Sequence, residues 1–177
     1  MKKERILAVL LLAALALLAA RALFGWPTDH EDIIPVEVDV TQPFYPVYFG
    51  SLDNGLLEPE FHQGSGTIEQ VLADLLAGPK LQHLVGVLPV DTAVLGYRQA
   101  GGTLYINFSH HLVSNHPGGS TGEILTVYGI VNSLTDIAGV ERVQILVENQ
   151  IIETLAGHLN LQRALVKDHS ALGSSVL

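Results

Sequence analysis

The sequence predicts an α+β domain in which two helices pack on one face of a mainly antiparallel sheet. Two segments of the 177-residue chain have the three-to-four-residue apolar spacing of a buried helix face. The runs around them alternate in polarity and end in tight turns, as strands do, and the last two strands are expected at residues 140–147 and 151–155. The expected order is ββαββαββ, for which two helices on one face of a sheet is the two-layer solution.

Two hairpins are expected in the compact part of the chain. Residues 47–49 form a strand-like run, and Asp53-Asn54-Gly55 is a typical turn sequence before a second strand. Further on, residues 94–97 should pair with residues 103–109, with Gly101-Gly102 in the turn.

The first helix is predicted to begin after Thr67 and to end before Gly78-Pro79. Thr67 can accept a hydrogen bond from the backbone of Gln70 while the Gln70 side chain reaches back, which is a capping box. A Gly-Pro pair then stops the helix. The buried face follows the i, i+3, i+4, i+7, i+8 pattern and consists of Ile68, Val71, Leu72, Leu75 and Leu76.

The second helix is predicted over residues 121–138. Ser120 would be its N-cap, Glu123 would complete a second capping box, and Gly139 would occupy the C-terminal cap position. Because some apolar residues fall off its main stripe, we expect a second, partly covered face. The stripe consists of Ile124, Val127, Tyr128, Val131 and Leu134, and the residues off it are Leu125, Ile130 and Ile137.

The N-terminus carries an export or anchoring signal, residues 1–26. Lys2, Lys3 and Arg5 precede the apolar run 6–20, which keeps the N-terminus in the cytoplasm and the domain outside. The run covers about 22 Å as a helix, less than the ~30 Å hydrocarbon core, and it reaches the needed length if Arg21 snorkels to the headgroups. We therefore expect a signal anchor in the cell membrane. The alternative is a secreted protein whose signal peptide is cleaved near Ala20-Arg21-Ala22.

Beyond this signal, three further parts are expected. Residues 27–45 are rich in proline and acidic residues and form an extended linker, with a short strand at residues 36–40. The domain spans residues 46–165, and residues 166–177 form a C-terminal tail.

Composition excludes several classes of function. The chain has no cysteine, so it forms no disulfide and carries no acylated cysteine of the lipoprotein type. Its formal net charge of −9 and its scattered cations argue against nucleic acid as a partner.

Four stretches resemble the GerMN family of sporulation and spore germination proteins, in the family's order and spacing over residues 46–163. The turn at Asn149-Gln150 departs from the family, where an Asp-Gly-like pair is common, and the chain has one copy where some members carry two. The four stretches are Val71 to Pro79 (VLADLLAGP), Gly102 to Ser109 (GTLYINFS), Gly118 to Glu123 (GGSTGE), and Tyr128 to Thr135 (YGIVNSLT) with its continuation through Gly139-Val140 to Gly157-His158.

The resemblance implies an envelope protein with a role in sporulation or germination and no known enzymatic activity, cofactor or catalytic residue to transfer. It also implies a fold similar to ring-building modules of secretion-type assemblies. The expected role is therefore an interaction or assembly module that binds envelope proteins, with a homo-oligomer as one possibility.

A hydrolase is the most tempting alternative. Gly118 to Gly122 reads as G-x-S-x-G around Ser120, and Asp136 and His158 follow in hydrolase order. A nucleophile elbow needs a strand that runs directly into the turn, and the preceding strand ends about ten residues earlier. We therefore interpret Ser120 as a helix cap and predict no enzyme.

A metal site is the second alternative. His110, His111 and His116 lie near Asn107 and Ser109, and clustered histidines can bind zinc. Adjacent histidines at a strand end point to opposite sides, so at most two of the three converge. We predict an exposed, pH-responsive loop and no metal.

Two hypotheses of ligand binding remain. A cell-wall glycan could bind through Tyr97, Tyr105 and Asn107, and an anion could bind at the helix N-termini that follow Gly64-Ser65-Gly66 and Gly118-Gly119. The caps themselves usually fill such N-termini. An interaction module that offers a sheet edge or helix face to a partner is the leading hypothesis.

Overall fold

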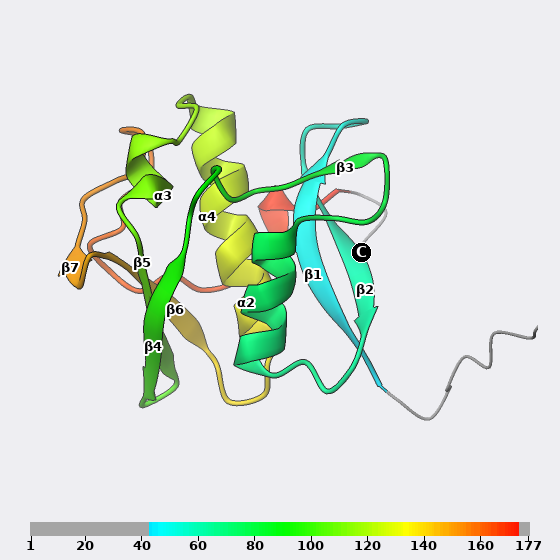
Figure 1. Ribbon diagram of the computed structural model, residues 1–177, viewed down its shortest axis with the longest axis horizontal. Helices are drawn as coiled ribbons and strands as arrows, with labels where there is room; N and C mark the ends of the chain where they lie inside the picture. Colours follow the sequence, from blue (N-terminus) through cyan, green and yellow to red (C-terminus); the bar gives the residue numbers. More distant parts are fainter. Residues whose placement is uncertain (1–42, 174–177) are drawn as a thin grey trace, which may run out of the picture. The chain divides into compact units, whose positions relative to one another are not determined.

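Two sheets with the two long helices between them make up residues 43–173, the part of the chain that the computed structural model describes (Figure 1). The α+β class is confirmed, but the prediction of one sheet with both helices on one face is wrong. One sheet has three strands in the order β2-β1-β3, and the other has four in the order β4-β5-β6-β7. The elements are β1 (Phe44–Ser51), β2 (Leu57–Gln63), α2 (Ile68–Ala77), β3 (Leu84–Val85), β4 (Val94–Ala100), β5 (Thr103–Phe108), α3 (His111–Ser114), α4 (Ser120–Thr135), β6 (Arg142–Val147), β7 (Gln150–Ile151) and η1 (His169–Ala171).

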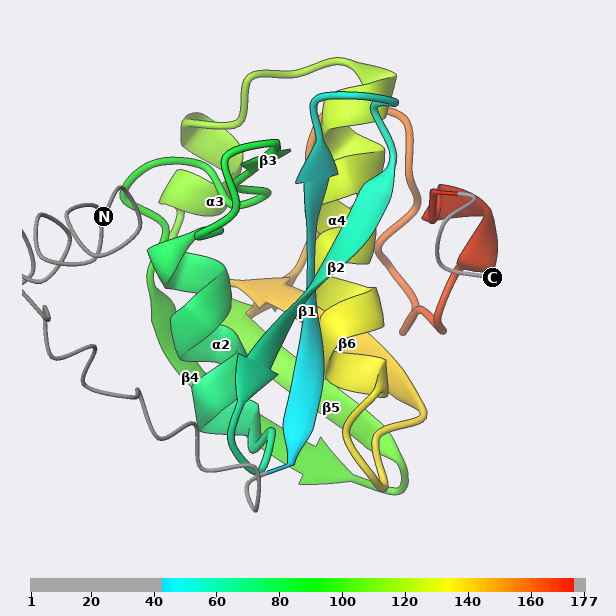
Figure 2. The ribbon, with the colours of Figure 1, turned by 90° about the vertical axis from the view of Figure 1, so that its right-hand side faces the viewer.

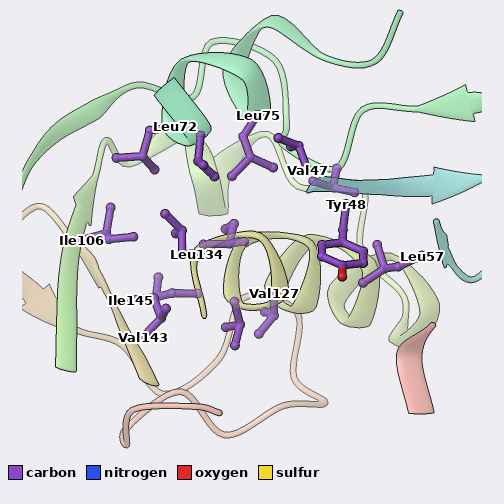
Figure 3. Packing of buried hydrophobic residues seen from close by; sticks show 14 of the residues in the cluster. Val47, Tyr48, Leu57, Leu72, Leu75, Ile106, Val127, Leu134, Val143 and Ile145 are labelled. Carbon is purple, nitrogen blue, oxygen red and sulfur yellow. The ribbon is translucent and has the colours of Figure 1, made fainter. Parts of the chain in front are cut away.

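Helix α4 explains why there are two sheets. It packs against β1 of one sheet and against β6 of the other. Figure 3 shows its Leu134 between Ile145 of the four-stranded sheet and Tyr48 of the three-stranded sheet. Ile130, which falls off the predicted apolar stripe, is fully buried. Because apolar residues lie on more than one face of α4, the helix needs partners on several sides, and a second sheet covers the expected second face.

The four-stranded sheet is mixed. β5 and β6 run parallel, with Leu104 opposite Val143 and Phe108 opposite Val147. Parallel neighbours need a long crossover, and α4 provides it. The prediction of a mainly antiparallel sheet therefore misses this central pair, although every other pairing of named strands in residues 43–173 is antiparallel.

The two hairpins and α2 follow the local signals, whereas β3 and α3 were not predicted. β1 pairs with β2 and β4 pairs with β5 as the two predicted hairpins. The capping box of α2 is present: the Gln70 amide N–H donates to Thr67 Oγ1 at 3.3 Å, and the Thr67 amide N–H donates to Gln70 Oε1 at 3.1 Å. Gly78 ends the helix with a φ of 79°.

The predicted ends of α4 are wrong. Ser120 is its first residue and Gly119 is the N-cap, with no side-chain capping bond, so neither Ser120 nor Glu123 forms a capping box. The carboxylate of Glu123 points instead to the segment 154–158, which offers it four hydrogen-bond donors rather than one. The helix ends at Thr135, with Asp136 rather than Gly139 as its C-cap.

The predicted strand 151–155 is shortened to β7. A tight turn with Glu148 and Asn149 at φ values of 50° and 64° joins β6 to β7, so the turn forms without the glycine common in the family. Only Ile151 of the predicted strand is paired. The residues that follow it bind Glu123 and leave the sheet.

The end of the described chain packs on the domain. Ala171 and Leu172, in the predicted tail 166–177, are buried. Lys167 contacts Asp136 and donates to the Tyr48 hydroxyl at 3.1 Å. The predicted anchor 1–26 and the predicted strand 36–40 lie outside the described residues. Within residues 43–173 no helix is both long and apolar enough to cross a bilayer.

Gly129 sets how closely the segment before β4 approaches α4. A Cβ at this position would lie 2.8 Å from Val87 Cγ2. We expect Gly129→Ala to lower the free energy of unfolding by about 1 kcal/mol, because overpacking of about 1–3 kcal/mol outweighs a gain in helix propensity of up to ~1 kcal/mol. Gly122→Ala in the same helix is the control, since its nearest neighbour would be His116 Cε1 at 3.6 Å. Urea unfolding of both variants checks this, and equal effects would contradict it.

Candidate functional site

The free edge of β4 is the feature of the domain most suited to binding another chain. β4 is the outermost strand of its sheet and pairs only with β5 (Figure 1). All of its residues from Leu95 to Ala100 are exposed. An edge of this length is a template on which an extended segment can form a further strand.

The hairpin turn tells which backbone groups of β4 point outward. Gly101 and Gly102 both have positive φ, 55° and 74°, as a two-residue type I′ turn requires. Ala100 and Thr103 close the turn and form a hydrogen-bonded pair. Because such pairs alternate along an antiparallel ladder, the N–H and C=O groups of Gln99 and Tyr97 point away from β5 to the free edge.

The side chains of β4 are tied to their surroundings and leave this backbone edge open. The Tyr97 hydroxyl donates to the Glu69 carboxylate of α2, which raises the pKa of Tyr97 and lowers the pKa of Glu69. The Arg98 guanidinium lies 4.6 Å over the ring of Tyr105, a cation–π contact. Gln99 Nε2 donates to the Gly139 carbonyl at 2.8 Å. The side chains are therefore held beside the edge rather than across it.

The edges of the three-stranded sheet are protected at several positions. The Tyr48 amide N–H of β1 donates to Ser133 Oγ of α4 at 2.9 Å. On β2, the Leu57 carbonyl accepts from the Gly173 amide at 2.9 Å, and Pro59 has no N–H to offer. β3 and β7 have two residues each. In residues 43–173, the protection of β2 covers Leu57 and Pro59, and β4 has the longer run without it, from Leu95 to Ala100.

The residues of the hydrolase reading do not converge. Ser120 begins α4 and Asp136 caps its other end, so the 16-residue helix separates them by about 24 Å. Asp136 contacts Lys167 and accepts from the Tyr48 hydroxyl at 2.9 Å. The amide of His158 donates to Glu123 Oε2 at 2.8 Å. These residues have structural roles at different places in the domain.

Two of the three histidines near β5 lie together, and the third is bound elsewhere. His110 and His111 lie at the start of α3 rather than on a strand, and their rings are 3.9 Å apart, so the expectation that they point to opposite sides is wrong. His116 Nδ1 accepts from the Gly118 amide at 3.0 Å, and its Nε2 lies 3.3 Å from Thr126 Oγ1. In residues 43–173 no three His, Asp or Glu side chains are grouped to hold a metal ion.

The three residues proposed to bind a cell-wall glycan, Tyr97, Tyr105 and Asn107, lie apart. Tyr97 is opposite Ile106 and Tyr105 is opposite Arg98, so the two tyrosines lie on different faces of the sheet. Asn107 is buried and donates to Asn149 Oδ1 at 3.0 Å. The structure therefore brings no aromatic platform together from these residues.

The glycine segments before the two helices differ in how their backbone amides are bound. At α2 the amide of Thr67 is bound by Gln70, whose Oε1 also accepts from Ser65 Oγ at 3.1 Å. At α4 the amide of Gly118 is bound by His116. The expected capping is present at α2, whereas Gly119, the N-cap of α4, makes no side-chain capping bond.

Sequence reasoning missed the most buried charge of the domain, Glu123. Its carboxylate is fully buried and accepts from the Thr154 hydroxyl and from the amides of Leu155, Ala156 and His158 at 2.8, 3.0 and 2.8 Å. Burial would raise the pKa of Glu123, but these hydrogen bonds outweigh it and lower the pKa to about 2. Two of the family-like stretches, GGSTGE and Gly157-His158, thus meet at one carboxylate.

A second buried polar cluster centres on His62 of β2. Its Nε2 lies 2.9 Å from Glu60 Oε1 and its Nδ1 lies 3.1 Å from Asp74 Oδ2. Asp74 also accepts from the Tyr45 hydroxyl at 2.5 Å, and burial together with this bond raises the pKa of Tyr45 to about 12. The two-residue spacing of Glu60 and His62 placed both on one face of a strand, which was the available signal.

Comparison with solved structures finds the same fold in proteins of Clostridium perfringens and Bacillus subtilis. A candidate lipoprotein of Clostridium perfringens is 26% identical, with a TM-score of 0.53 over 71% of this chain and 88% of that one. The tandem GerMN domains of the sporulation protein GerM from Bacillus subtilis are 15% identical, with a TM-score of 0.59 over 77% of this chain and 49% of that one. The chain thus spans about half the length of the tandem protein. The first GerMN domain of GerM alone is 16% identical, with a TM-score of 0.53 over 75% of this chain and 98% of that one.

No curated protein matches this chain. The family model described as "sporulation and spore germination", Germane, matches residues 46–153, which is more than half of the chain. The resemblance found in the sequence is thereby confirmed. The chain belongs to the Germane family of sporulation and spore germination proteins.

Proposed function

We propose that the chain is a non-catalytic interaction module of the envelope of a spore-forming cell. It binds a partner protein at the free edge of β4, where an extended segment of the partner adds as a further strand. The observation that carries this proposal is the contrast between β4 and the protected edges of the other sheet. An unprotected edge is an aggregation hazard unless it is used.

The rest of the chain is consistent with this role. The apolar N-terminal segment 1–26 would hold the chain at the membrane as a signal anchor. The predicted linker, which ends where β1 begins at Phe44 rather than at residue 45, would hold the domain away from the surface, outside the cell. The acidic composition disfavours nucleic acid. The separation of Ser120 from Asp136 along α4 disfavours hydrolysis by that set of residues.

A photoreactive residue in place of Leu95 on β4 tests the binding edge in sporulating cells. Leu95 is half exposed, and Phe61 on β2, which is 66% exposed, is the control position on a protected strand. We expect capture of one protein from position 95 and not from position 61. Capture of only glycan or lipid, or equal capture at both positions, would contradict the proposal.

Gln99→Pro tests whether the backbone makes the contact. Because the Gln99 amide points outward, proline removes a donor from the free edge without removing a hydrogen bond to β5. Gln99→Ala is the matched control, since both variants lose the side-chain bond to Gly139. We expect proline to reduce capture from position 95 at least about fivefold, the effect of losing a hydrogen bond of about 1 kcal/mol, and alanine to leave most of it. Similar capture by the two variants would rule out pairing through this amide.

A further inference from the structure

The partner segment must satisfy two different faces of β4. On the face toward the helices, Tyr97 and Gln99 stand opposite the core residues Ile106 and Leu104 of β5. On the other face, Arg98 is exposed, and no carboxylate in residues 43–173 lies within ion-pair distance of it. A segment that adds beside β4 therefore needs an acidic residue next to Arg98 and apolar residues next to Tyr97.

The chain itself contains a segment with this pattern. Residues 36–40 read Val-Glu-Val-Asp-Val, and Pro35 and Pro43 lie on either side of them. In an extended conformation the three valines face one side and the two acids face the other. Valine beside tyrosine and a carboxylate beside arginine are both favourable cross-strand pairs. Charge and apolar pattern both match β4.

The segment cannot reach β4 of its own chain. Val40 is four residues before Phe44, the first residue of β1, so the chain between them spans at most about 14 Å. Figure 1 places β1 and β4 on opposite sides of the domain, with α2 and α4 between them. Only β4 of another copy is within reach.

We propose that residues 36–40 of one copy add as a strand to the free edge of β4 of a second copy. This inference rests on the proposed function of β4 and names its partner as a second copy of the chain. Each copy then has a donor segment, residues 36–40, and an acceptor edge, β4, and these two are different surfaces of the chain. Contacts of this head-to-tail kind produce rings or open filaments rather than a two-fold dimer.

Cysteine pairs in the full-length chain test the contact directly, because the natural chain has no cysteine. Val38→Cys in one copy and Gln99→Cys in a second copy, which carries a size tag, are mixed in detergent solution with a short bis-maleimide. We expect a crosslinked product that contains both copies. The control replaces Gln99→Cys by Phe61→Cys on the protected strand β2, where we expect little product.

Charge reversal separates a specific pairing from random collision. Arg98→Glu in the acceptor copy should lower the yield of crosslinked product roughly fivefold, since like charges across a strand pair repel. Glu37→Lys together with Asp39→Lys in the donor copy should restore it. Arg98 is exposed, so its replacement does not alter the domain core.

Three results would overturn the inference. The first is an equal yield of crosslinked product from Gln99→Cys and Phe61→Cys. The second is that the charge swap does not restore the yield. The third is a crosslink within one chain when a single copy carries both Val38→Cys and Gln99→Cys and is diluted. If these occur while position 95 still captures a different protein in cells, the proposed function stands and only the identity of its partner is wrong. If position 95 captures no protein either, both fail together.

Discussion

Replacement of Glu123 by glutamine should lower the free energy of unfolding by about 3 kcal/mol at pH 7, the value of a pKa lowered from 4.5 to about 2. The carboxylate accepts one hydroxyl and three amide hydrogens in a fully buried position. Glutamine has one acceptor oxygen, and its amide group would face backbone donors. Chemical unfolding of wild type and variant measures the difference.

The effect of this variant should depend on pH in a defined direction. Because the folded-state pKa of Glu123 is depressed, the stability it contributes is present above about pH 4.5 and is lost as the pH falls toward about 2. The difference between wild type and Glu123→Gln should therefore be constant from pH 5 to pH 7 and shrink below about pH 4.5. A difference that grew on acidification would contradict the assignment of the charged form.

The matched control for this prediction is Glu153→Gln, an exposed glutamate two residues after β7. We expect it to change stability by less than about 0.5 kcal/mol. Hydrogen exchange gives a second readout, since the amides of Leu155, Ala156 and His158 should lose protection in Glu123→Gln and keep it in the control. Equal stabilities of the two variants would mean that Glu123 does not hold this segment.

Replacement of His62 by alanine should cost about 3 kcal/mol, because it removes a large buried side chain and leaves a cavity between two carboxylates that keep their other hydrogen bonds. The imidazole is 5% exposed and faces Glu60 and Asp74. Its ring also stacks on Tyr45, with centroids 5.8 Å apart. Alanine would leave two carboxylates near each other around a cavity in the three-stranded sheet.

His83→Ala is the control for His62. The His83 side chain is 45% exposed and lies 3.6 Å from Glu58, so its removal should cost less than about 1 kcal/mol. Thermal and urea unfolding of both variants at one pH compare the two sites. A cost for His62→Ala no greater than that for His83→Ala would show that the buried cluster contributes little.

The local features that the sequence predicted correctly depend on neighbouring residues. The capping box of α2 needs only Thr67 and Gln70, three residues apart, and the hairpin turn needs only Gly101 and Gly102. The features it missed depend on distant residues. Glu123 has the spacing of a capping box, yet its carboxylate binds amides more than 30 residues away in the chain. Four converging donors are stronger than the single local bond.

The sequence predicted that the candidate site is a sheet edge, but it did not predict which strand forms that edge. A sheet edge was expected to engage a partner, but only the pairing of strands shows that β4 lies outside β5 and that β1 is covered by Ser133 of α4. The glycan-binding residues were chosen from their types. The strand register then put Tyr97 and Tyr105 on opposite faces, because side chains alternate along a strand.

The sequence by itself determined the α+β class, the order of the main elements and the family, since these follow from hydrophobic periodicity, turn residues and motifs within short windows. The tertiary structure alone decided that there are two sheets, that β5 and β6 run parallel, and which edge stays free. The physical reason is that α4 carries apolar residues on more than one face, and these faces can be buried by one sheet or by two. Long-range packing buries α4 between two sheets, and no local sequence pattern encodes that packing.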